Sequence, residues 1–325
     1  MKISQLIENQ KEVIQILENS KNKNKLVHAY IFEGEDGTGI YEAAKYFASM
    51  ILCEKEKPCF ECSTCTRILQ EEHTNVQIIE PINGTIKKEQ ITDVIKEFTM
   101  TGLEEGSRIY IINEADKMNV ASSNALLKFL EEPVPNRYAI LLTNNHRKLL
   151  DTIISRCQLI HFKPLSKEKM IDHYKNLGVN EDVAYILSNL TSDYDQAQKM
   201  INEGIVLDLI DLAKKVNDER NKKRNPYISF YTKNNVLKEN HSKEINETFL
   251  SILILICEER IKYLNNSNNY YFSNLVNRTP HKKDSLKKAI TELEIYCKYQ
   301  ERMRNNVNVE LQYASMFVEL EREAY

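Results

Sequence analysis

The chain has 325 residues, of which 42% are hydrophobic and 28% charged, a composition that excludes a disordered or collagen-like protein. Its 8 Gly and 7 Pro are few for this length, which favours long helices over an all-β sandwich. The net charge of −3 gives no global attraction to nucleic acid or to an anionic membrane. The longest apolar run, residues 249–257, is far shorter than the roughly 20 residues that cross a bilayer. The charged N-terminus lacks the apolar core of a signal peptide, so we expect a cytoplasmic protein without membrane contact.

Apolar runs and helical periodicities alternate through the first 165 residues. We expect one amphipathic helix within residues 1–20, because its apolar positions recur at helical spacing. The runs that follow predict strands at 28–33, 76–79, 108–113, 138–143 and 159–162, with helices at 41–51, 88–98 and 121–132 between them. This alternation predicts right-handed βαβ units and a parallel sheet over residues 1–165.

The strand signals stop after residue 165. Residues 166–203 predict a small helical lid domain, and residues 204–325 predict an all-α C-terminal domain. Polar stretches at 217–225 and 265–269 are typical of turns between helices. Basic clusters at 220–224 and 281–288 are expected to be solvated helix ends and loops. The predicted fold class is therefore α/β plus all-α.

A degenerate phosphate-binding loop follows the first predicted strand. The pattern G-x-x-x-x-G-K-[ST] is met by Gly34 and Gly39, so the backbone can still form the turn. Ile40 replaces the Lys that reaches the β- and γ-phosphates, and Tyr41 replaces the Ser or Thr whose hydroxyl holds Mg²⁺. We therefore expect a strand-to-helix turn that binds no nucleotide; a non-standard nucleotide site is the alternative.

The third predicted strand, 108–113, ends where nucleotide-binding proteins of this type carry a metal-binding acid, and that position is also altered. Asn113 stands where a metal-coordinating Asp is expected, and Glu114 occupies the general-base position. Without the Lys and the metal, a base there has no charged phosphate on which to act. Glu114 and Asp116 are also the residue types that a helix N-terminus favours, and we prefer that interpretation.

Four cysteines lie within thirteen residues, in the spacing C-x5-C-x2-C-x2-C. Closely spaced thiolates repel one another, and a tetrahedral Zn²⁺ with four sulfur ligands relieves that repulsion. An iron–sulfur cluster and unligated thiols are the alternatives. We predict a structural zinc insert over residues 53–65, with these ligands: Cys53, Cys59, Cys62 and Cys65. The isolated Cys157, Cys257 and Cys297 are expected to be small buried hydrophobic residues.

These features occur together with further motifs: His28-Ala29-Tyr30, Asn-Ala-Leu-Leu-Lys-Phe-Leu-Glu-Glu-Pro at 124–133, and Ser155-Arg156-Cys157. The sequence resembles the delta-prime subunits of the bacterial DNA polymerase III clamp loader, which belong to the AAA+ superfamily. The resemblance is dense over residues 1–165 and thinner afterwards; Asn305-Asn306-Val307-Asn308 is similar to the end of the family's collar. It implies an AAA+ domain with a zinc insert, a lid, and a collar for oligomerisation over 204–325.

The resemblance also implies a function. The chain would be a subunit without catalysis of its own in the DNA polymerase III holoenzyme, whose complex has DNA polymerase activity. It would assemble with gamma/tau and delta subunits and support ATP-dependent loading of the sliding clamp onto primed DNA. Arg156 is similar to the arginine finger that reaches a neighbouring subunit's ATP, although a lone Arg there is more often solvated. The alternatives are an ATP-hydrolysing gamma/tau-like ATPase and a zinc-dependent nucleic-acid-binding module.

Overall fold

The computed structural model describes residues 2–99, 106–221, 226–233, 237, 242–265, 286–303 and 308–323. Its contacts divide the chain into two compact units, Met1–Leu165 and Ser166–Tyr325. The division of the chain into three domains stays a prediction. Within the described ranges, no helix combines the length and the apolar character needed to cross a bilayer.

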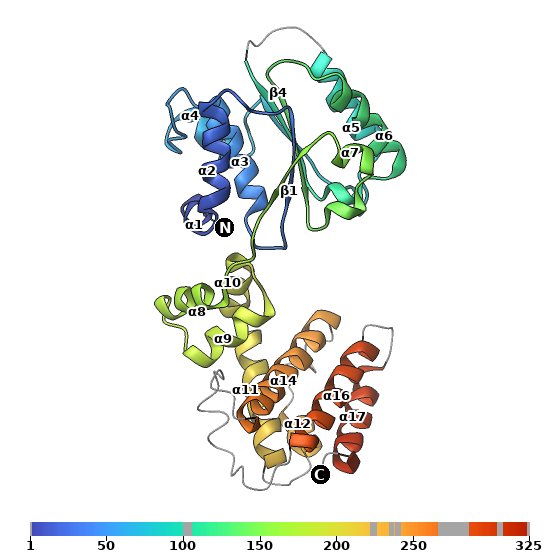
Figure 1. Ribbon diagram of the computed structural model, residues 1–325. Coiled ribbons are helices and arrows are strands. Elements are labelled where there is room, and N and C mark those ends of the chain that lie inside the picture. The colour runs from blue at the N-terminus through green and yellow to red at the C-terminus, as the bar shows by residue number, and fades with distance from the viewer. Residues whose placement is uncertain are drawn as a thin grey trace. The chain divides into compact units, whose positions relative to one another are not determined.

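The first unit is built on a five-stranded sheet in the order β2-β3-β4-β1-β5 (Figure 1). All four strand pairs are parallel. Its strands are β1 (Ala29–Glu33), β2 (Val76–Ile79), β3 (Arg108–Ile112), β4 (Arg137–Thr143) and β5 (Gln158–His161). Each predicted apolar run therefore forms a strand, with ends that shift by one residue or not at all.

Helices cover both faces of this sheet (Figure 1). One face packs against α1 (Ile3–Asn9), α2 (Lys11–Asn22), α3 (Ile40–Leu52) and α4 (Ser63–Leu69). The other packs against α5 (Lys88–Thr99), α6 (Val120–Glu131) and α7 (Asp151–Ile154). The short 3₁₀ helices η1 (Ala115–Lys117) and η2 (His146–Lys148) follow β3 and β4. Because strands buried on both faces must be continuously apolar, the sequence signals these strands strongly.

The second unit is helical throughout the residues that the structure describes. It contains α8 (Lys167–Asn176), α9 (Glu181–Leu190), α10 (Tyr194–Asn202), α11 (Ile205–Asn221), α12 (Pro226–Lys233), α14 (Lys243–Leu264), α16 (Leu286–Met303) and α17 (Val309–Glu323). The apolar run 249–257 lies in α14 and is largely buried, as its lack of a polar face predicts. The predicted fold class, a parallel α/β part followed by helices, is confirmed.

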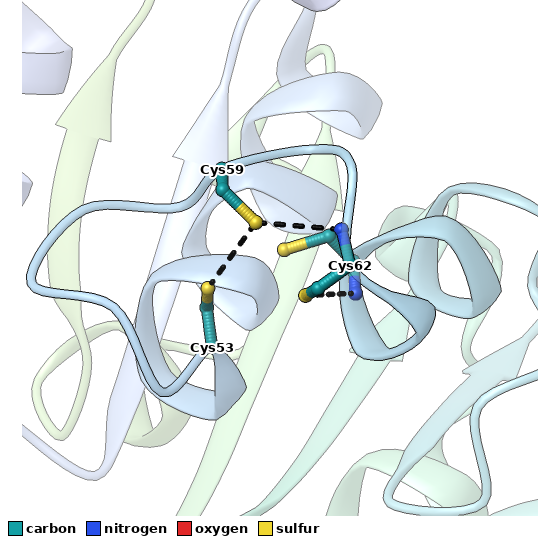
Figure 2. Close-up of side chains that lie close together, drawn as sticks. Cys53, Cys59 and Cys62 are labelled. Atoms are coloured by element: carbon teal, nitrogen blue, oxygen red, sulfur yellow. Dashed lines mark hydrogen bonds between the residues drawn. The ribbon is translucent and has the colours of Figure 1, made fainter.

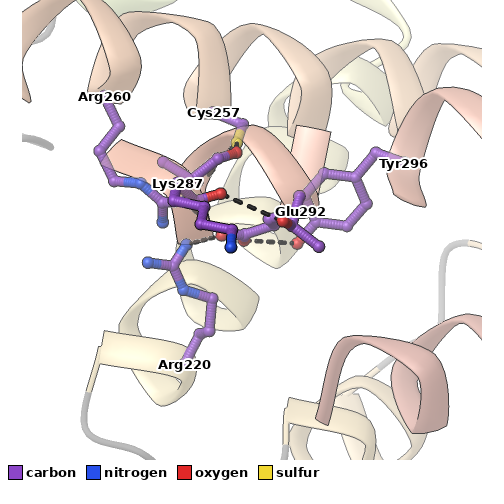
Figure 3. A network of polar contacts seen from close by, with 8 residues as sticks. Arg220, Cys257, Arg260, Lys287, Glu292 and Tyr296 are labelled. Carbon is purple, nitrogen blue, oxygen red and sulfur yellow. Dashed lines mark hydrogen bonds and ion pairs between the residues drawn. The ribbon is translucent and has the colours of Figure 1, made fainter. Parts of the chain in front are cut away.

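A buried ion cluster joins three helices of the second unit (Figure 3). One oxygen of Glu292 on α16 accepts hydrogen bonds from Arg220 on α11 and from Arg260 on α14. Tyr296 donates its hydroxyl to the other oxygen, at 3.1 Å. All three charged side chains are almost fully buried, with exposed fractions of 4–5%. Charges in such a place require partners, because leaving one unpaired costs several kcal/mol, roughly 3–5.

Four details of the sequence-based predictions were wrong. The opening segment forms two helices that meet at Gln10, not one. Residues 217–221 continue α11 instead of forming a turn, and Arg220 is buried in the ion cluster rather than solvated. Of the three isolated cysteines expected to be buried, Cys257 is buried, Cys157 is partly buried and Cys297 is exposed. The rest of the predicted turns and basic clusters at 222–225, 266–269 and 281–285, and the collar motif at 305–307, lie outside the described residues.

Candidate functional site

Four cysteines converge where α3 passes into α4. Cys53 ends α3, Cys62 is the N-cap of α4, and Cys65 lies in the first turn of α4. Figure 2 shows the sulfur atoms of Cys53, Cys59 and Cys62 turned toward one another. The four sulfurs all lie within 4.8 Å of one another, and we refer to this group as the cysteine cluster. The predicted ligands are thus brought together in space.

The dimensions of the cysteine cluster fit a tetrahedral metal ion. The sulfurs of Cys53 and Cys59 are 3.8 Å apart. A tetrahedron with metal–sulfur bonds of about 2.3 Å has sulfur–sulfur edges of about 3.8 Å. Four sulfur donors around one centre could hold a metal ion and are compatible with zinc, which prefers this donor set and geometry.

Backbone amides further organise the sulfurs of the cluster. The N–H of Cys62 donates to Sγ of Cys59 at 3.4 Å, and the N–H of Cys65 donates to Sγ of Cys62 at 3.4 Å. Amides of Glu61 and Cys62 lower the pKa of the Cys59 thiol to about 6, which favours its thiolate. Burial instead raises the pKa of Cys65 to about 12. Four thiolates therefore need a cation to be stable together.

The turn between β1 and α3 closes on itself. Thr38 is fully buried, and its backbone N–H donates to the carbonyl of Glu35 at 3.1 Å. Its hydroxyl donates to the same carbonyl at 2.7 Å. A phosphate-binding loop instead directs successive N–H groups toward the anion. At Thr38 these donors are already used inside the turn.

The space inside this turn is filled by protein atoms. A Cβ added to Gly34 would lie 2.4 Å from Oγ1 of Thr38 and 2.9 Å from Cβ of Phe162. No side chain fits there without movement, which explains the glycine without any ligand. The second glycine, Gly39, has φ of 88° and begins α3, so it serves the turn geometry.

The two replaced positions of the loop face the protein rather than solvent. Ile40 and Tyr41 are partly buried and pack against the core that α3 forms with the sheet. Burial raises the pKa of the Tyr41 hydroxyl, and its hydrogen bond to Glu71 raises that pKa further. Glu71 in turn pairs with Lys45 at 2.6 Å. Neither a phosphate-binding cation nor a Mg²⁺-binding alcohol stands at these two positions.

The end of β3 carries polar groups that bind one another. Asn113 donates its amide to Glu80 at 3.4 Å and accepts the N–H of Glu114 at 3.1 Å. Glu114 precedes η1 with a left-handed backbone, φ of 46°. Asp116, within η1, accepts the hydroxyl of Thr143 at 3.0 Å. Asp116 thus has a structural partner at the end of β4.

Arg156 lies in the turn between α7 and β5, as its sequence position predicts. Its side chain is 35% exposed and contacts Glu131, with 2.9 Å between Nη2 and Oε1. Since β5 is parallel to β1, residues that precede β5 lie where the strands begin, whereas residues that follow β1 lie at the opposite end of the sheet, where the strands end. The structure therefore does not bring Arg156 together with the turn at Gly34.

One polar cluster was not foreseen from the sequence. Glu33, His146 and His161 meet where β4, β1 and β5 end, and each imidazole Nδ1 lies 2.5 Å from an oxygen of Glu33. The available signal was positional. Glu33 ends the predicted strand 28–33, His161 is the last residue but one of the predicted strand 159–162, and the carboxyl ends of adjacent parallel strands lie at the same end of the sheet.

Sequence comparison bears on the identity of the first unit. Residues 9–166 match the sequence model of a family described as DNA polymerase III, delta subunit. This part of the chain is similar in sequence to the DNA polymerase III delta subunit family. The resemblance inferred from the cysteine spacing, the motif at 124–133 and Ser155-Arg156-Cys157 is confirmed.

Two curated relatives illustrate the range of this similarity. The DNA polymerase III subunit delta-prime of Bacillus subtilis (strain 168) is 40% identical over 193 residues, which make up 59% of this chain and 59% of that protein. The tau subunit of the same organism is 35% identical over 167 residues, 50% of this chain and 29% of that protein. The match thus spans less than two thirds of either relative's length.

Among solved structures, a DNA polymerase III gamma subunit-related protein from Thermotoga maritima is similar to this chain. The two share 16% identity, and the match covers 95% of this chain and 99% of that one, with a TM-score of 0.46.

Proposed function

We propose that this chain is a delta-prime-type subunit of a DNA polymerase III clamp loader, of the AAA+ class. In this role it turns over no ATP itself and supports ATP-dependent loading of the sliding clamp onto primed DNA. The observation that carries the proposal is the family match over residues 9–166, together with 40% identity to a delta-prime subunit. Its partners would be gamma/tau and delta subunits, with clamp and DNA contacted through the complex.

The turn after β1 supports a subunit that is idle toward ATP. Ile40 carries no charge for a phosphate, and Tyr41 replaces the Ser or Thr that binds Mg²⁺ with a phenol whose hydroxyl is bound to Glu71. Thr38 uses its N–H and hydroxyl inside the turn, so these donors cannot cradle an anion. Asn113, bound to Glu80, lacks the charge of a metal ligand.

The cysteine cluster supports a structural role for zinc. Cys53, Cys59, Cys62 and Cys65 would supply all four ligands, which leaves no open position for a reacting water. Zinc bound there cross-links α3 to α4 and so stiffens the insert against the sheet. The cluster carries no residue pattern that requires redox chemistry.

Arg156 is proposed as an arginine finger that acts in trans. Its place before β5, at the opposite sheet edge from Gly34, keeps it from serving the turn of its own chain. A guanidinium is always charged and forms two parallel hydrogen bonds to phosphate oxygens. If it reaches the γ-phosphate of a neighbouring subunit, it stabilises charge that develops during phosphoryl transfer.

An ATP-hydrolysing subunit is the second candidate, because a tau subunit is 35% identical to part of this chain. The two candidates differ in one measurement, ATP binding by the isolated chain. A tau-like ATPase binds and hydrolyses ATP alone, whereas a delta-prime-type subunit with an idle site does neither.

Reconstitution tests the proposal. The chain is combined with gamma/tau and delta subunits, and clamp loading onto primed DNA is measured with and without it. Arg156→Ala should slow ATP turnover at one site by about 10³–10⁵-fold, so total ATPase falls in part while clamp loading falls further. Arg156→Lys should not rescue fully, because an ammonium cannot form the paired bonds. The control is Arg147→Ala, which removes another exposed Arg of the same unit.

Clamp loading that does not depend on this chain would contradict the proposed function. Clamp loading that requires the chain but is unchanged by Arg156→Ala would instead assign Arg156 to the solvated surface and leave the subunit assignment intact.

A further inference from the structure

The guanidinium of Arg156 makes three contacts within the first unit, one ion pair and two hydrogen bonds. Nη2 pairs with Oε1 of Glu131 at 2.9 Å, at the end of α6. Nη1 donates to the carbonyl of Thr152 at 2.8 Å and to the hydroxyl of Ser155 at 3.3 Å. Thr152 lies in α7 and Ser155 directly follows that helix, so both contacts are local in sequence, whereas Glu131 comes from a different helix.

These contacts leave hydrogen-bonding capacity on the guanidinium. An Arg side chain has five N–H donors in a rigid plane, and the two hydrogen bonds of Arg156 both come from Nη1. The side chain remains 35% exposed. Arg156 is therefore fixed in place while part of its donor edge stays accessible to an acceptor from another molecule.

Glu131 itself is attached to a rigid frame. The carbonyl of Leu130, the residue before it, lies 3.1 Å from Nε2 of His28, which directly precedes β1. Leu130 is 3% exposed and packs in the same core cluster as Ile153 of α7, which is fully buried. The end of α6 and the turn that carries Arg156 are thus both fixed to the sheet.

We propose that Glu131 is a positioning residue for Arg156, which it orders before a neighbouring subunit's phosphate arrives. The proposal rests on the proposed function of Arg156. A free Arg side chain has many rotamers, and restricting them beforehand lowers the entropy lost when the phosphate binds. The carboxylate is suited to this because its negative charge attracts the guanidinium at Nη2, 2.9 Å away.

Two variants of Glu131 and one matched control test this role in the complex with gamma/tau and delta subunits. The quantity measured is the Arg156-dependent part of the clamp-stimulated ATPase rate, that is, the rate above that of Arg156→Ala. Glu131→Ala should lower the kcat of this part roughly two- to five-fold, as expected for an exposed ion pair, with KM for ATP unchanged. Glu131→Gln, which keeps an acceptor but no charge, should fall between. Glu132→Ala removes the exposed neighbouring carboxylate and should match the wild type.

A double variant separates positioning from a general structural effect. If Glu131 acts through Arg156, Glu131→Ala should cause no further loss in the Arg156→Ala background. Independent losses would overturn the proposal, as would Glu131→Ala kinetics equal to wild type while Arg156→Ala is impaired. If Arg156→Ala itself has no effect, the finger proposed for Arg156 fails, and this inference fails with it.

A measurement on the isolated chain gives a second readout. ¹⁵N NMR of arginine side chains reports rotation of each guanidinium. Arg156 should rotate more slowly in the wild type and in Glu132→Ala than in Glu131→Ala. Equal rotation in all three proteins would overturn the ordering role of Glu131.

Discussion

The carboxylate of Glu33, at the end of β1, bridges to His161, at the end of β5, with 2.5 Å between Oε2 and Nδ1. Its other oxygen accepts the backbone N–H of His146 at 2.8 Å and lies 2.5 Å from Nδ1 of that residue. One side chain thus links the carboxyl ends of three adjacent strands, directly before the turn at Gly34.

This link predicts a pH dependence of stability. Burial raises the pKa of the Glu33 carboxyl, but the N–H of His146 and the two imidazoles outweigh burial and place it below its ordinary 4.5. A lowered folded-state pKa contributes stability above pH 4.5, which is lost as the pH falls through the folded value. Glu33→Gln should therefore cost about 1–3 kcal/mol at neutral pH and flatten the loss of stability in acid. Urea unfolding as a function of pH measures this.

The control for that experiment is Glu35→Gln, at an exposed position two residues further on. Its pH profile should follow the wild type. A Glu33→Gln profile parallel to the wild type throughout the acid range would contradict the prediction.

We expect one Zn²⁺ per chain, bound by the cysteine cluster. Cys62→Ser should release the metal and destabilise the first unit by several kcal/mol, since structural zinc contributes on the order of 10 kcal/mol to small zinc domains. Elemental analysis and thermal unfolding measure the two effects. Cys297→Ser changes an exposed thiol of the second unit and should alter neither. Iron in the purified protein, or an intact protein without metal, would refute the zinc assignment.

Isothermal calorimetry of the isolated chain with MgATP should show no binding in the micromolar range. Ile40→Lys alone should create no turnover. Tyr41 and Asn113 still replace the Ser or Thr and the Asp that coordinate Mg²⁺, and Thr38 still closes the turn. A micromolar Kd for the unmodified chain would favour the tau-like ATPase instead.

The buried ion cluster of the second unit predicts a large mutational effect. Glu292→Gln removes the buried carboxylate that Arg220 and Arg260 share, and should cost about 3–5 kcal/mol of unfolding free energy. Glu294→Gln, at an exposed position on the same helix, should stay within about 0.5 kcal/mol. Urea denaturation of both variants compares them directly. Similar midpoints for the two would show that the second unit does not depend on the cluster.

The sequence predicted the sheet well because its strands are buried on both faces. Residues 138–143, for example, form a predominantly apolar run that lies within β4, where residues 139–143 are all buried. The cysteine cluster was equally accessible, because its ligands lie within thirteen residues and local spacing almost determines their geometry. Arg156 was placed correctly by the short helix and strand on either side of it.

Contacts between distant residues account for the features that the sequence did not reveal. Arg220 reads as part of a basic, solvated stretch, and only its pairing with Glu292, 72 residues along the chain, makes it a buried residue. Glu131 stands in a motif as one of two acids, and nothing local tells which of them contacts Arg156. The break between α1 and α2 also falls at a residue with distant contacts, because the side chain of Gln10 binds the carbonyls of Thr38 and Lys163.

Gln10 bears on the order in which the first unit folds. Its side-chain amide donates to the carbonyl of Thr38 at 3.1 Å and to that of Lys163 at 2.8 Å, the latter 153 residues further along the chain. Such a contact closes a loop over nearly the whole unit, and long loops close late because their entropy cost comes first. During synthesis, α1 and α2 therefore emerge early but gain this anchor only when β5 has been made. The turn at Thr38 becomes fully anchored at the same late step.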